Sequence, residues 1–119
     1  MSKIVPKFGD IFYAELKRDG NVQGGCRPVI IAQNDIGNMH SPIVEVIPIT
    51  SKHKASYMPT HVTITADDIS GLDTDSVAMA EQVRVIPQTA LRQRVGQLKH
   101  HELVGVGKAR NIQSPFPVA

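Results

Sequence analysis

The sequence predicts a mainly β (α+β) fold: a small, closed or nearly closed barrel with short helices and a C-terminal helix. Three observations indicate it. Short segments rich in β-branched and aromatic residues recur along the chain, turn-forming residues separate them, and one helical stretch lies near the C-terminus. The 119 residues, 41% of them hydrophobic, fit a single domain over residues 1–119 with one core.

The first half of the chain contains three predicted strands, at residues 10–16, 27–33 and 43–50. The second is too apolar and β-branched for a half-exposed strand, which favours a central place in the sheet. The third contains Pro48, which cannot donate a backbone hydrogen bond and therefore indicates an edge, a bulge or the strand's end. A cluster of turn-forming residues at 34–38 precedes it.

The second half is expected to contain more short elements and the longest helix. Leu103, Val104, Val106 and Ile112 are the expected buried stripe of that helix. The predicted elements, in chain order, are a strand at 61–65, one helical turn at 66–71, a long strand at 76–86, a short helical link at 87–91, a strand at 92–98 and a helix at 99–112.

Composition and charge limit the location and the partners. The single cysteine, Cys26, cannot form an internal disulfide, which is compatible with a reducing compartment. No apolar run is long enough to cross a bilayer and the N-terminus has no signal-peptide core, so we expect a cytoplasmic protein. The net charge is only +2, yet residues 84–110 contain six lysine or arginine residues and one glutamate. That stretch makes either a local positive field or an ordinary solvated face.

The most informative segment is residues 23–29, where a glycine loop becomes a strand. Gly24 and Gly25 permit backbone angles that are closed to other residues, and Pro28 suits the start of a strand. Arg27 is therefore held at a rigid strand entrance, and its planar fork of donors matches a phosphate. The segment predicts a site for a phosphate-bearing ligand; a surface ion pair is the alternative role of this arginine.

Two further polar positions extend this candidate site. Thr50 ends the predicted strand at 43–50, where its hydroxyl either donates to a phosphate oxygen or satisfies backbone groups. If Arg27 and Thr50 lie at the same end of adjacent strands, the two form a phosphate clamp. Gln82 interrupts the apolar strand at 76–86 and either reads the edge of a base or faces outward on an alternating strand.

No metal or cofactor is expected. The five histidines lack the spacing of a zinc hydrolase, and the aspartates lack the glycine and distal glutamate of a calcium loop. The sequence has neither a P-loop nor a dinucleotide fingerprint. Cys26 has no base nearby in sequence and is interpreted as a small packing residue rather than a nucleophile.

Six segments occur together in the order and at the spacing of a known family. They lie at residues 9–16, 23–29, 33–38, 46–50, 59–62 and 76–84. These segments resemble the MazF/PemK family of toxin endoribonucleases from toxin–antitoxin pairs. The likeness covers roughly residues 8–86, whereas the C-terminal part agrees in shape more than in residues. Val22 is a departure, because some relatives carry a polar or acidic residue there.

The resemblance implies an SH3-like barrel, a homodimer, and metal-independent cleavage of single-stranded RNA (mRNA) at a short sequence. Attack by the ribose 2′-hydroxyl would leave a 2′,3′-cyclic phosphate and a 5′-hydroxyl. Arg27 and Thr50 would be the catalytic pair. Arg27 would chiefly stabilise the phosphorane, since an arginine is too weak a base to take the 2′-proton, and Thr50 would donate to a non-bridging oxygen. The RNA-binding residues would be Asn21, Gln23, Lys52, Met58, Gln82 and Arg84.

The resemblance also implies a partner. Toxins of this family are inhibited by a cognate antitoxin whose acidic, disordered segment wraps the dimer, and the cationic stretch at 84–110 suits such a segment. Two alternatives stay open. One is a toxin of the same fold that poisons a protein target such as DNA gyrase through its C-terminal helix, here residues 99–112. The other is a non-catalytic RNA-binding module.

Overall fold

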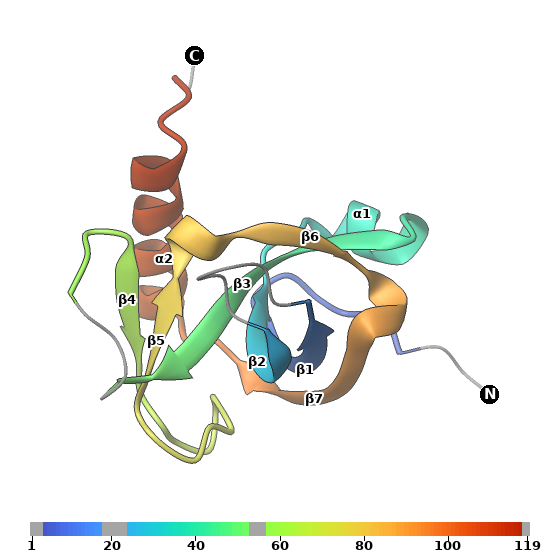
Figure 1. The fold of residues 1–119 in the computed structure, drawn as a ribbon, viewed down its shortest axis with the longest axis horizontal. Coiled ribbons are helices and arrows are strands. Elements are labelled where there is room, and N and C mark those ends of the chain that lie inside the picture. The colour runs from blue at the N-terminus through green and yellow to red at the C-terminus, as the bar shows by residue number, and fades with distance from the viewer. Residues whose placement is uncertain (1–3, 18–23, 53–56, 118–119) are drawn as a thin grey trace.

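The computed structural model describes residues 4–17, 24–52 and 57–117. Within them, seven strands form an antiparallel sheet that carries a long C-terminal helix (Figure 1). The strands are β1 (Asp10–Leu16), β2 (Gly25–Ile31), β3 (Ile43–Ser51), β4 (His61–Ile64), β5 (Ser76–Met79), β6 (Arg84–Pro87) and β7 (Leu91–Gln97). The helices are α1 (Asp35–His40), α2 (His100–Gln113) and the two short 3₁₀ helices η2 (Ala80–Gln82) and η3 (Gln88–Ala90).

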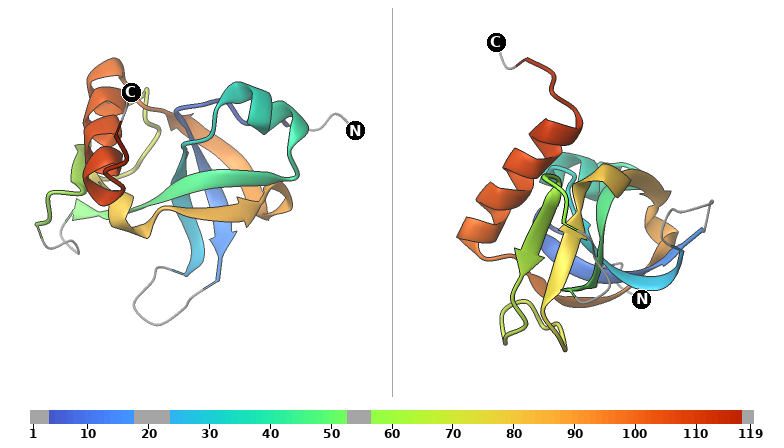
Figure 2. Two further views of the ribbon diagram at one scale, coloured as in Figure 1. Left: turned by 90° about the horizontal axis from the view of Figure 1, so that it is seen from above. Right: turned by 60° about the vertical axis from the view of Figure 1, so that its left-hand side comes forward.

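The strands follow the order β4-β5-β3-β2-β1-β7, and β6 pairs with the first half of β3. The sheet curls around its own core, as the two views in Figure 2 show. The end strands β4 and β7 do not pair with each other among the described residues, so the barrel is not closed. The predicted mainly β architecture with a C-terminal helix is confirmed.

Both faces of the central strands are buried, which explains why β2 and β3 are almost continuously apolar. On one face, Ile30 belongs to a cluster that includes Val106 of α2. On the other face, Val29 belongs to a cluster that includes Ile86 of β6. The central strands therefore lie between two apolar clusters, one that includes α2 and β4 and one that includes β6.

The ladder between β3 and β2 ends at Pro48. Its last pair is Val29–Pro48, and the ladder between β3 and β5 begins at Ile49–Ala78. The proline thus lies inside the strand, at the point where β3 leaves β2, rather than at the strand's end. A missing backbone donor costs least where a ladder ends.

The turn predicted at 34–38 is instead the start of α1. Asn34 caps this helix, because its side-chain oxygen accepts a hydrogen bond of 2.9 Å from the backbone N–H of Gly37. Gly37 packs closely against Gln33, because a Cβ added at Gly37 would lie 2.9 Å from the Gln33 side chain. The cap and this close packing outweigh the poor helix propensity of the segment.

The single strand predicted at 76–86 is also wrong, because η2 divides it into β5 and β6. The backbone N–H of Ala80 donates to the carbonyl of Thr60, and that of Val83 donates to the carbonyl of Ala80. These bonds turn the chain out of the β5 direction. The short helical link before β7 is confirmed as η3.

Helix α2 forms as predicted, but its buried face differs. Val106 is buried, whereas Val104 and Ile112 are exposed. Glu102 takes a core position at 1% exposure, because its carboxylate accepts hydrogen bonds from the backbone N–H groups of Lys99 and Thr65. This capping bond sets the rotation of the helix. Neither α2 nor any other helix in the described residues could span a membrane.

Candidate nucleic-acid site

Arg27 and Thr50 lie on the same face of the sheet. Residues opposite each other in an antiparallel pair share a face, as do residues two apart along one strand. Val29 is opposite Pro48, so Arg27, two residues before Val29, and Thr50, two residues after Pro48, lie on one side. Continuing the register by two residues brings Arg27 level with Thr50.

Both residues line one pocket of about 220 Å³, where β3 leaves β2. The other lining residues come mainly from β1, the end of β3 and the segment that leads into β5. Several of their side chains carry hydroxyl groups. The other lining residues are Tyr13, Pro28, Ile49, Ser51, Leu72, Asp73, Thr74 and Ser76. Arg27 and Thr50, predicted to lie close together, therefore line the same pocket.

Arg27 is held by the glycine loop before it. Gly25 has a φ of +82°, the left-handed region that favours glycine. The chain turns back there, so that the Arg27 Nε–H donates a hydrogen bond of 2.9 Å to the carbonyl of Gly24. One edge of the guanidinium is fixed in this way, while its two Nη groups make no ion pair or hydrogen bond within the described residues. Those two groups are donors suited to a phosphate.

The Thr50 hydroxyl is buried without a hydrogen-bond partner among the described residues. The residue as a whole is 5% exposed. A buried hydroxyl without a partner costs about 1–3 kcal/mol, so folded proteins seldom contain one without a reason. A hydroxyl in this state, beside an arginine fork, can donate to an incoming acceptor such as a phosphate oxygen.

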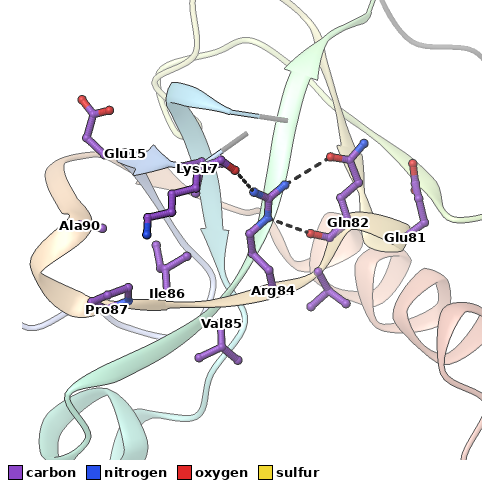
Figure 3. A pocket seen from close by; sticks show the side chains of 11 residues that line it. Glu15, Lys17, Glu81, Gln82, Arg84, Val85, Ile86, Pro87 and Ala90 are labelled. Atoms are coloured by element: carbon purple, nitrogen blue, oxygen red, sulfur yellow. Dashed lines mark hydrogen bonds between the residues drawn. The ribbon is translucent and has the colours of Figure 1, made fainter. Parts of the chain in front are cut away.

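A second, larger pocket of about 760 Å³ lies on the same face (Figure 3). Arg84 is opposite Val46, which is four residues before Thr50 on β3, so Arg84 and Thr50 point to the same side. The pocket is lined by Glu15, Leu16, Lys17, Glu81, Gln82, Val83, Arg84, Val85, Ile86, Pro87 and Ala90. The sheet face thus brings the predicted residues Gln82 and Arg84 together in a mostly apolar groove.

Arg84 reaches across this groove (Figure 3). Its Nη1 donates to the backbone carbonyl of Lys17 at 3.3 Å, and its Nη2 donates to the Oε1 of Gln82 at 3.4 Å. Burial lowers the pKa of the guanidinium below its ordinary value, but the group remains a cation at neutral pH. The groove therefore contains a charge that a polyanion would meet.

Glu81 anchors the turn that carries Gln82. Burial opposes ionisation of its carboxyl, but hydrogen bonds from His61 at 2.9 Å and from the Thr60 hydroxyl at 2.8 Å outweigh burial and lower the pKa. These three residues are not among the site residues predicted from the sequence. Their positions in two of the family-like segments, Thr60 and His61 in 59–62 and Glu81 in 76–84, could have indicated them.

Other predicted residues do not join the two pockets. Lys52 is exposed just after β3, and Met58 is 40% exposed before β4; neither lines either pocket. Asn21 and Gln23 lie outside the described residues. Cys26, interpreted from the sequence as a packing residue, is exposed. Its side chain faces away from Arg27, because neighbouring residues on a strand point to opposite faces.

Within the described ranges, no group of three or more histidine, cysteine, aspartate or glutamate residues is arranged to hold a metal ion. The hydrogen-bond donors at the smaller pocket are a guanidinium and hydroxyl groups, which bind and stabilise negative charge. The lining also contains one carboxylate, that of Asp73.

Comparison with known proteins identifies the family of this chain. Residues 7–112 match the model of the PemK-like, MazF-like toxin of type II toxin–antitoxin systems. The chain is 39% identical over 105 residues to the Endoribonuclease MazF of Staphylococcus saprophyticus, covering 87% of each. It is 38% identical over 110 residues to the Endoribonuclease EndoA of Bacillus subtilis, covering 92% of this chain and 94% of the relative.

Solved structures show the same fold. MazF from Deinococcus radiodurans superposes with a TM-score of 0.82 at 22% identity, covering 96% of this chain and 100% of that one. An endoribonuclease solved with its cognate antitoxin from a mycobacterial species superposes with a TM-score of 0.77 at 18% identity, covering 96% and 99% of the two chains.

Proposed function

Because the chain belongs to the PemK-like, MazF-like toxin family of type II toxin–antitoxin systems, we propose that it is an endoribonuclease that cuts single-stranded RNA at a short sequence. Two relatives at 38–39% identity are named endoribonucleases. The observation that carries the proposal is the buried, unpartnered Thr50 hydroxyl in the same pocket as the Arg27 fork. We also propose a cytoplasmic location, where an mRNA substrate would be met.

The proposed reaction needs no metal. The ribose 2′-oxygen loses its proton and attacks the adjacent phosphorus, a 2′-O–P bond forms, and the P–O5′ bond breaks. The leaving 5′-oxygen takes up a proton, so the products are a 2′,3′-cyclic phosphate and a 5′-hydroxyl. Negative charge grows on the non-bridging oxygens during the attack. Arg27 and Thr50 stabilise it with donors that are already in place, which is often the largest single contribution to catalysis.

The larger groove is proposed to hold the bases beside the cut. Single-stranded RNA suits this role because its unstacked bases expose edges that side chains can read. Gln82 offers both a donor and an acceptor, and Arg84 adds positive charge. Met58, Lys52, Asn21 and Gln23 are proposed as further RNA contacts.

Two protein partners are proposed. One is a cognate antitoxin with an acidic segment, for which the exposed Lys108 of α2 offers a cation, whereas Arg110 is already paired with Glu45; a mycobacterial protein of this fold is solved with its antitoxin. The other is a second copy of this chain. Exposed apolar side chains, which a dimer would cover, occur on α1, β3 and β6. They are Ile36, Met39, Ile43 and Val85.

The test is cleavage of a long RNA by purified protein in excess EDTA, with the cut sites and the end groups mapped. We expect cuts at one short sequence that leave cyclic phosphate ends, and at least a hundredfold slower cleavage by Arg27→Gln. The matched control is Arg92→Gln, which removes the same charge from a side chain that lines neither of the two pockets and, within the described residues, donates only to the carbonyls of Thr89 and Leu91.

Three results would reject the proposal: intact RNA, cutting that requires a metal, or full activity of Arg27→Gln. Growth arrest by a chain that leaves RNA intact would favour a protein target instead.

A further inference from the structure

The side chain of Arg84 links two parts of the chain that are far apart in sequence, the end of β1 and the neighbouring turn of η2 (Figure 3). Its Nη1 donates to the Lys17 carbonyl at the end of β1, 67 residues away. Its Nε donates to the backbone carbonyl of Gln82 at 3.5 Å, and its Nη2 to the side-chain Oε1 of the same residue at 3.4 Å. One guanidinium therefore binds both the backbone and the carboxamide of Gln82.

The bond to Oε1 matters because the two ends of a carboxamide are chemically opposite. The oxygen only accepts hydrogen bonds and the nitrogen only donates them. With Oε1 on Arg84, the Gln82 Nε2 lies 3.7 Å from the sulfur of Met79. A rotation of the amide by half a turn would bring two donors, Nε2 and the guanidinium, face to face. Arg84 thus selects one of the two orientations.

We propose that Arg84 is a positioning residue that sets the base preference of this chain by fixing which end of the Gln82 carboxamide faces the RNA. The inference rests on the proposed endoribonuclease function and adds the source of its specificity. Base edges differ in their pattern of donors and acceptors, so an amide held in one orientation prefers one pattern, and an amide that flips accepts both.

The geometry favours this role over a simple phosphate contact. Arg84 is half-buried, and its donors point to protein oxygens on both sides of the groove. A lysine could keep the charge but not the planar fork that reaches the Lys17 and Gln82 oxygens together. Arg84→Lys therefore keeps the positive charge in the groove but removes the contact that orients the Gln82 carboxamide.

The first experiment measures cleavage of an RNA library in which each position of the preferred site is varied. We expect Arg84→Lys and Arg84→Gln to lower base discrimination about tenfold at one position, a loss equal to about one hydrogen bond, with the other positions unchanged. Cleavage of the best sequence should fall for both variants, and less for Arg84→Lys, which keeps the charge. Arg92→Gln should keep the preference intact. Equal slowing of all sequences by Arg84→Lys, with the preference kept, would overturn the inference.

The second experiment does not depend on cleavage. Side-chain amide NMR of the protein without RNA should show Gln82, assigned with Gln82→Ala, as an ordered amide in the parent chain and as an averaged one in Arg84→Gln. An unchanged Gln82 amide would overturn the inference whatever the protein cleaves. An averaged amide in a protein that cuts no RNA would retain the positioning role and reject the proposed function.

Discussion

Arg27 of β2 and Thr50 of β3 share one face of the sheet and line one pocket, although 22 residues of sequence separate them. The shared face follows from β-strand alternation, and the pocket lies where the ladder between β3 and β2 ends at Pro48. Each residue alone is ordinary, whereas the pair places a fixed guanidinium beside a buried hydroxyl without a partner.

Thr50→Val should separate catalysis from stability. The substitution keeps the side-chain shape and removes a hydroxyl that has no partner within the described residues, so the free energy of unfolding should stay equal or rise by up to about 1 kcal/mol. RNA cleavage should fall by about 10²–10³, the usual loss when one oxyanion donor is removed. Denaturant unfolding and single-turnover cleavage measure the two effects.

Thr50→Ser is the matched control, because it keeps the hydroxyl and loses only a methyl group. It should lower the unfolding free energy by about 1 kcal/mol and keep most of the activity. A Thr50→Val chain that unfolds more easily yet cleaves normally would show that the hydroxyl is structural.

Acid should weaken the turn that carries Gln82. The folded-state pKa of Glu81 is lowered, so its contribution to stability is complete above the unfolded-state pKa, about 4.3, and is lost as the pH falls through the folded value. Glu81→Gln should therefore be about 1–2 kcal/mol less stable than the parent at pH 7. The difference should shrink towards zero as the pH drops below 4, measured by urea unfolding at several pH values. A difference that stays constant with pH would contradict the assignment.

The glycines of α2 should respond differently to alanine. A Cβ at Gly107 would meet nothing within 4 Å, and this residue borders a small apolar cavity under the helix. Gly107→Ala should therefore stabilise the protein by about 1 kcal/mol through helix propensity and raise its melting temperature by about 4–8 °C. At Gly105 the Cβ would lie 3.2 Å from Val62, so that substitution should gain less. Calorimetry of the two variants compares them, and a larger gain at Gly105 would refute the packing described for α2.

Much of the fold was predictable because local chemistry decides it. The strands follow from apolar segments between turn residues, and the glycine loop before Arg27 follows from the backbone angle that Gly25 adopts. The segment from Asn34 was misread as a turn, because a capped helix and a turn begin with the same residue types.

Other features depend on contacts between distant residues, which no local pattern contains. The bond from Arg84 to the Lys17 carbonyl and the pairing of Glu81 with His61 both require the sheet to be assembled. The burial of Glu102 runs against the usual exposure of glutamate and depends on its capping bonds to Lys99 and Thr65. These features decide how the larger groove is shaped and how α2 is rotated.

The most direct test of the central claim is a double-mutant cycle of Arg27→Gln and Thr50→Val, measured as the single-turnover cleavage rate of one RNA in excess EDTA. If both groups stabilise the same phosphorane, each single variant should lose at least about a hundredfold, and the double variant should lose little more than the worse single one. Losses that multiply in the double variant, or a single variant that cleaves at the parent rate, would contradict the claim that the two side chains act on one phosphodiester.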